Sequence, residues 1–71
     1  MTLDELNKKL RELPRGQTFI VKTADLAEMD VPGILATEHK KRAEWIVGQL
    51  PSQYRIDECP DTLSISFIRS N

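Results

Sequence analysis

The residues with the most evident chemistry form one basic run, His39-Lys40-Lys41-Arg42, the densest positive stretch of the chain. Lysine and arginine side chains contact phosphate oxygens, and arginine also reads guanine in the major groove of DNA. The run therefore indicates binding of an anionic polymer. Basic residues on a surface helix are also often only solvated, so the run by itself allows both interpretations.

Four further residues extend or oppose this predicted DNA-contacting set. On a helical wheel Thr37 shares the outward face with Lys41 and lies nearer the helix start, where base contacts usually arise. Glu44 lies on the same face and would repel phosphate. Arg55 and Lys22, on other predicted elements, are placed to contact backbone phosphates. The predicted set is mixed in charge.

Trp45 lies on the flank of the same predicted helix and allows two interpretations. It either packs into the core or anchors a protein partner, because tryptophan is enriched in binding hot spots. Glu38 lies on the same flank, four residues before Arg42, in the order that favours an ion pair on a helix. Trp45 and Glu38 are therefore the candidate partner-binding residues.

The sequence contains no set of residues that would support catalysis or metal binding. His39 is the only histidine and Cys59 the only cysteine, so the chain lacks a zinc-ligand set and an intrachain disulfide. No Ser-His-Asp or Cys-His set and no glycine-rich phosphate loop can be assembled. His39 is expected to be a hydrogen-bonded core residue. We expect no enzyme activity and no cofactor.

The composition predicts one small globular domain spanning 1–71. Ten basic residues face eleven acidic ones, and a net charge of −1 is unlike that of a strongly basic nucleic-acid binder. No apolar run is long enough for a signal peptide or a membrane span. An unpaired cysteine fits a reducing compartment, so we expect a cytoplasmic protein.

The first half of the chain carries clear helix and strand signals. Thr2 followed by Glu5 is a capping box, and leucines then recur at helical spacing until Pro14. A β-branched stretch predicts a strand over 18–22. A short helix is expected over 24–29, with Thr23 as its N-cap.

The second half predicts one long helix and two strands. The helix is expected over 33–50, and the strands over 54–58 and 63–67. The apolar face of the helix is expected to comprise Leu35, Ala36, His39, Ala43, Ile46, Val47 and Leu50. In the last strand the residues expected in the core are Leu63, Ile65 and Phe67.

This order of elements resembles that of the winged helix-turn-helix domain. The segment 19–27, in which Thr23 precedes the pair Leu26-Ala27, resembles the lead-in to the second helix of many such regulators. The whole chain is similar to small winged-helix proteins of Gram-positive phages and mobile elements. The resemblance implies an α+β fold in which the first strand joins the C-terminal hairpin in a small three-stranded antiparallel sheet.

Two functions follow from these predictions. The first is a DNA-binding regulator of transcription that reads double-stranded DNA through helix 33–50, with a homodimer matching a palindrome. The second is a protein-binding inhibitor or adaptor that docks on a host or phage protein through the Trp45 flank. The acidic hairpin residues Asp57, Glu58 and Asp61 favour the second function, because carboxylates repel phosphate.

Overall fold

The computed structural model describes residues 1–70, so Asn71, the last residue of the predicted domain, lies outside the described residues. The elements in chain order are α1 (Leu3–Glu12), β1 (Thr18–Lys22), α2 (Thr23–Ala27), α3 (His39–Gly48), β2 (Tyr54–Cys59) and β3 (Ser64–Arg69). The predicted α+β class, the order of elements and the three-stranded antiparallel sheet are confirmed.

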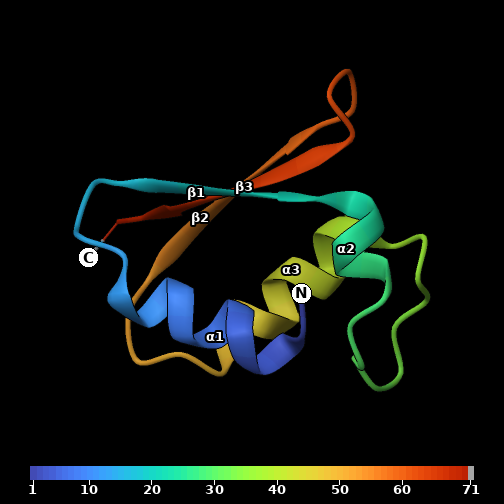
Figure 1. The fold of residues 1–71 in the computed structure, drawn as a ribbon, viewed down its shortest axis with the longest axis horizontal. Helices are drawn as coiled ribbons and strands as arrows, with labels where there is room; N and C mark the ends of the chain where they lie inside the picture. Colours follow the sequence, from blue (N-terminus) through green and yellow to red (C-terminus); the bar gives the residue numbers. More distant parts are fainter. Residues whose placement is uncertain (71) are drawn as a thin grey trace.

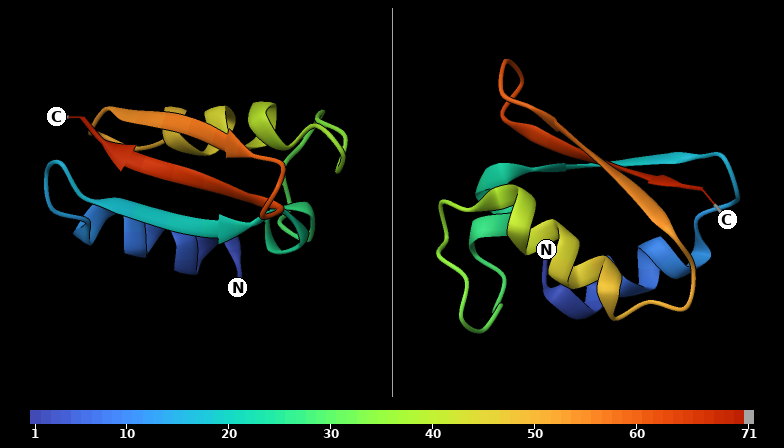
Figure 2. Two further views of the ribbon diagram at one scale, coloured as in Figure 1. Left: turned by 90° about the horizontal axis from the view of Figure 1, so that it is seen from above. Right: turned by 180° about the vertical axis from the view of Figure 1, so that it is seen from behind.

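The sheet has the strand order β1-β3-β2, so the C-terminal strand lies in the centre and pairs antiparallel with both neighbours. The helices lie on one side of this sheet, with α1 and α3 running beneath it and α2 at one end (Figures 1 and 2). Alternate side chains of a strand point to opposite faces. Ile65 and Phe67 are accordingly buried against the helices, whereas Ile20 is 63% exposed on the open face.

Helix α1 forms as its sequence predicts. The Thr2 side chain accepts a hydrogen bond from the backbone N–H of Glu5 at 3.2 Å, which confirms the N-cap. Leu6 and Leu10 are fully buried and attach the helix to the core.

Two long-range hydrogen bonds fix the end of α1 to the sheet. The Tyr54 hydroxyl donates to the Leu10 carbonyl at 2.6 Å, and the Arg69 guanidinium donates to the Leu13 carbonyl at 2.7 Å. The Leu10 carbonyl also accepts the backbone N–H of Leu13, so the tyrosine hydroxyl is a second donor there, and the arginine supplies a donor for the Leu13 carbonyl just past the helix. The two side chains also join α1 to β2 and β3.

The predicted helix over 33–50 is wrong at its start, because α3 begins only at His39. Residues 28–38 form a loop instead, in which Gly33 adopts φ +75°, a conformation outside the helical region. Leu35 is 68% exposed and Ala36 is also exposed, so neither is the core residue that helical spacing predicted. Val31 takes part in the core in their place.

Arg42 explains the path of this loop. Its side chain is only 4% exposed, and its guanidinium donates to the carbonyls of Leu26 at 3.3 Å, of Ile34 at 3.0 Å and of Met29. A planar guanidinium offers several donors in a fixed fork, which suits carbonyls that converge from different segments. Arg42 thus joins α2 and the following loop to α3. Its predicted role as a DNA-contacting residue is wrong, because its donors are used inside the protein.

The hairpin between β2 and β3 differs from its prediction at Leu63 and in its bounds, because β2 extends to Cys59 and β3 runs from Ser64 to Arg69. Leu63, expected in the core, is 68% exposed and has φ 51°. Its carbonyl accepts hydrogen bonds from the backbone N–H and the hydroxyl of Thr23, at 2.9 and 3.1 Å. Thr23 therefore attaches the hairpin to the start of α2 instead of serving as the predicted N-cap, and Ser64 is buried in the position next to Leu63.

We predict that Arg42→Met lowers the free energy of unfolding by about 2–4 kcal/mol, because buried carbonyls lose their donors. That is most of the roughly 3–5 kcal/mol that a domain of this size holds. Urea unfolding followed by circular dichroism measures the change. Lys41→Met at the next, exposed position is the control and should stay within about 0.5 kcal/mol. Equal unfolding midpoints for the two variants would contradict the structural role of Arg42.

Candidate nucleic-acid interface

Three of the predicted DNA-contacting residues lie together at the start of α3. They line a shallow open pocket of about 330 Å³. We call this surface the α3 start, and its residues are Thr37, Glu38, His39, Lys40, Lys41 and Glu58. The last of these comes from β2, so the pocket joins the helix to the sheet. Thr37, Lys40 and Lys41 are all exposed.

The first turn of α3 is unusual in its charge. It contains Lys40 and Lys41 and no acidic residue, although the positive end of the helix dipole favours acidic side chains there. The N-cap residue Glu38 makes no side-chain capping hydrogen bond. The first N–H groups of a helix have no partner within it, so they remain available here. Backbone donors, the helix dipole and two lysines all favour an anion at this surface.

The carboxylates of Glu38 and Glu58, which line the same pocket, oppose the positive charge of the two lysines. Glu38 lies 3.9 Å from the Lys41 ammonium, and the lysine side chain is 71% exposed. An ion pair in such an exposed position contributes little, and an incoming phosphate can compete with it. The structure therefore pairs Glu38 with Lys41 and not with Arg42, whose guanidinium is occupied by carbonyls.

Buried Arg42 adds a formal positive charge beneath the α3 start. Within residues 1–70 the ion pairs are Lys41 with Glu38 and Arg55 with Asp57, so no carboxylate pairs with Arg42. Its charge is balanced only by carbonyl dipoles. A charge in a region of low dielectric constant is screened less than one in water, so Arg42 contributes to the local field although it is not accessible.

The structure does not bring Arg55 and Lys22 to the α3 start. Both belong to the open face of the sheet, where Arg55 pairs with Ile68 and Lys22 with Ser64 in the strand register. The Arg55 guanidinium also lies 3.5 Å from the Asp57 carboxylate. These two residues are therefore separate from the surface that carries Lys40 and Lys41.

Trp45 and His39 are both partly buried. Trp45 packs against the core cluster, which matches the structural interpretation of this residue. His39 lies at the edge of the α3 start, and its Nδ1 atom is buried without a hydrogen-bond partner among residues 1–70. The expected hydrogen bond to this nitrogen is therefore not present in the part of the chain that the structure describes.

Sequence reasoning missed two exposed leucines at this end of the molecule. Leu35 in the loop and Leu63 in the hairpin are each 68% exposed. The loop, α2 and the hairpin turn lie at the same end in all three ribbon views (Figures 1 and 2). Helical and strand periodicity assigned both leucines to the core, so only a turn signal such as Pro32-Gly33 pointed to another outcome.

Comparisons with known proteins gave no match among protein-family models, curated proteins or solved structures. No helix within residues 1–70 has the length and apolar character needed to cross a membrane. The same residues hold no cluster of three or more His, Cys, Asp or Glu side chains placed for a metal ion. What the α3 start can bind is therefore inferred from its own residues and geometry.

The same lysine-to-glutamate substitution should have opposite effects at the start of α3 and at the end of α1, because the helix dipole is positive at the start and negative at the end. Lys40→Glu places an acid in the first turn of α3, whereas Lys9→Glu places one in the last turn of α1. The first variant should exceed the second in free energy of unfolding by about 1 kcal/mol at low ionic strength. Urea unfolding at low salt measures this difference.

The two variants are matched in net charge and in one helix neighbour, but Lys9 also has Glu12 three residues away, where Lys40 has Ala43. Each lysine has a glutamate four residues away on its helix, Glu44 for Lys40 and Glu5 for Lys9, and the net charge changes equally. The difference should shrink at about 1 M salt because the dipole is screened. Equal stabilities at low salt would show that no excess positive potential exists at the α3 start.

Proposed function

We propose that this chain is a winged-helix DNA-binding module with a regulatory role, which presents the α3 start to duplex DNA. The element order and the strand order β1-β3-β2 support a winged-helix arrangement, in which the first strand joins the C-terminal hairpin. Helices α2 and α3 then correspond to the helix-turn-helix, with α3 as the recognition helix. The long loop 28–38 replaces a tight turn between them.

One observation carries this proposal: the first turn of α3 holds two lysines and no acid, and its N-cap residue Glu38 makes no side-chain capping hydrogen bond. Each of these features by itself lowers the stability of the helix, because acidic and capping residues stabilise a helix at its N-terminus. Together they place two ammonium groups beside backbone N–H donors at the helix start, with the carboxylates of Glu38 and Glu58 at its edge. Phosphate is the common ligand that satisfies the ammonium groups and the backbone donors at once.

The small number of available cations limits the strength of binding. Lys40 and Lys41 are the exposed cations of the α3 start, and the acidic hairpin residues Asp57, Glu58 and Asp61 repel phosphate. One copy is therefore expected to bind duplex DNA only weakly, with a Kd on the order of 10⁻⁴ to 10⁻⁶ M. Two copies on a palindromic site would double the contacts and give useful affinity.

A protein partner is the second candidate function. The exposed Leu35 and Leu63 favour it, because exposed aliphatic side chains lose unfavourable hydration when a partner covers them. Trp45 does not add to this surface, since it already packs against the core. The acidic hairpin is equally compatible with a basic protein surface.

The DNA-binding proposal predicts that Lys40→Ala/Lys41→Ala weakens binding to a short duplex by about tenfold or more, because two phosphate contacts are lost. The slope of log affinity against log salt should fall by about one for each lysine removed. Fluorescence anisotropy over a range of salt concentrations measures both quantities.

The double variant Lys8→Ala/Lys9→Ala on α1 is the matched control, because it removes the same charge from another exposed surface. Its affinity should stay within about twofold of the original, since it removes no phosphate contact. Equal losses in the two double variants would assign binding to overall charge. Absence of binding even at low salt would remove DNA as the ligand.

A further inference from the structure

A second surface, in which carboxylates outnumber cations, lies between the start of α1 and the end of α2. It is an open pocket of about 630 Å³. Its apolar side chains are Met1, Leu3 and Met29, of which Met1 is 44% exposed and Met29 is nearly buried. Methionine is flexible and polarisable, so it adapts to aliphatic side chains of different shape. We call this surface the acid-rimmed groove.

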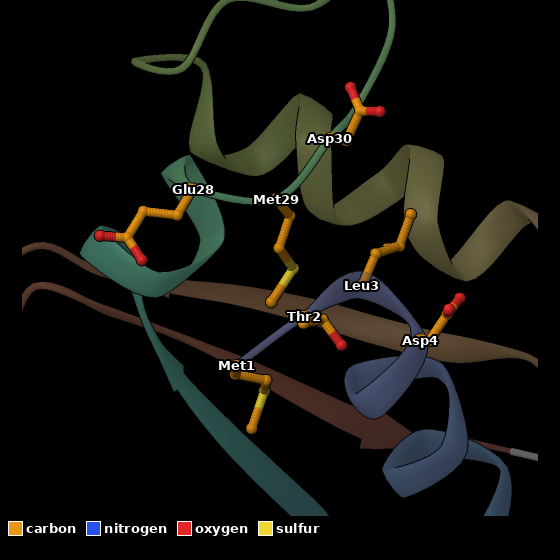
Figure 3. Close-up of a pocket in the computed structure, with 7 residues that line it drawn as sticks. All are labelled: Met1, Thr2, Leu3, Asp4, Glu28, Met29 and Asp30. Atoms are coloured by element: carbon orange, nitrogen blue, oxygen red, sulfur yellow. The ribbon is translucent and has the colours of Figure 1, made fainter.

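Three carboxylates surround the apolar side chains of the groove. Figure 3 shows Glu28 from the end of α2, Asp30 from the following loop and Asp4 from the first turn of α1 on different sides of the two methionines. All three residues are exposed. Within residues 1–70 none of them forms an ion pair, and the one cation of the groove lining is the α-ammonium of Met1. The rim therefore holds an excess of negative charge.

The arrangement excludes some ligands by its chemistry. Duplex DNA is repelled by the carboxylates. A metal ion needs oxygen ligands that converge within about 2.0–2.6 Å of one point, whereas these side chains point apart (Figure 3). No group of three acidic side chains in the described residues is placed to hold a metal ion.

We propose that the acid-rimmed groove binds a basic amphipathic helix of a protein partner. Such a helix inserts an aliphatic side chain between Met1 and Leu3, and its lysines or arginines reach the rim carboxylates. Long basic side chains cover apolar surface with their methylene groups while the charged end stays at the rim. A methionine-containing apolar groove with surrounding acids is suited to helices that combine leucine with lysine.

This inference is independent of the DNA-binding proposal, because the acid-rimmed groove shares no residue with the α3 start. It also differs from the predicted partner site at Trp45, which lies on α3. Loop 28–38 contributes Asp30 to the groove and Thr37 to the α3 start, so one molecule can hold a protein and DNA on different surfaces.

The test uses a fluorescein-labelled, amphipathic leucine–lysine peptide of about 14 residues with helical spacing, and two comparison peptides. In one of them glutamate replaces every lysine, and in the other serine replaces every leucine. We expect the leucine–lysine peptide to bind with micromolar affinity in fluorescence anisotropy, and both comparison peptides to bind at least about tenfold more weakly, because each lacks one of the two contacts. Equal binding of the leucine–lysine and serine–lysine peptides would overturn the apolar part of the proposal.

Matched variants locate the binding site. Glu28→Gln/Asp30→Asn removes two rim charges with little change in shape, and Glu44→Gln/Asp61→Asn removes two charges from other exposed positions. The first variant should bind the leucine–lysine peptide about fivefold to tenfold more weakly, and the second within about twofold, because only rim carboxylates contact the peptide.

Backbone amide chemical shifts of the wild-type protein provide a second readout that does not depend on substitution. Titration of the leucine–lysine peptide should perturb Leu3, Asp4 and residues 28–30 most strongly. Perturbations confined to other residues, equal losses in both double variants, or absence of binding would each overturn the proposal. None of these outcomes depends on whether the protein binds DNA.

Discussion

The burial of the Arg42 guanidinium is the constraint on which the described structure depends. Burying a charged group without partners costs several kcal/mol, so the side chain needs hydrogen bonds to several acceptors. The carbonyls of Leu26, Met29 and Ile34 supply them. The Leu26 carbonyl lies in α2 and also accepts the backbone N–H of Met29, whereas the carbonyls of Met29 and Ile34 lie in the loop 28–38, where buried polar groups need a partner. Each side of this interaction satisfies the other. Its consequence is that α2, the loop 28–38 and α3 form one connected unit.

The residues beside this interaction face outward. The Ile34 carbonyl accepts from Arg42, the neighbouring Leu35 side chain is exposed, and α3 starts after Glu38. Thr37, Lys40 and Lys41 then gather around one shallow pocket. The positive helix start is locally unfavourable for the isolated helix, and tertiary contacts through Arg42, Ala43 and Ile46 keep it in place. Local propensity and native structure disagree at this point, and such disagreements are concentrated at functional sites.

The near-neutral composition conceals two surfaces that differ in their balance of charge. The α3 start combines two lysines with a helix dipole and a buried guanidinium, whereas the acid-rimmed groove gathers Asp4, Glu28 and Asp30 around apolar side chains. A net charge of −1 is the sum of these contributions and describes neither surface. Interaction with an anion or a cation depends on the local field, because charges farther apart than about 8–10 Å are largely screened in salt. A nearly neutral small domain can therefore bind partners of both signs.

Local signals in the sequence determined much of the fold. The Thr2 cap and the leucine spacing placed α1, the β-branched run placed β1 at 18–22, and the alternation of Ile65 and Phe67 identified the core side of β3. These signals act between residues a few positions apart, so the sequence contains them in full. Only the tertiary structure decided where α3 begins, that Arg42 is buried, and that Leu63 points outward. Each of these outcomes depends on a partner distant in sequence, such as Leu26 for Arg42 or Thr23 for Leu63, and periodicity along the chain carries no information about such pairs.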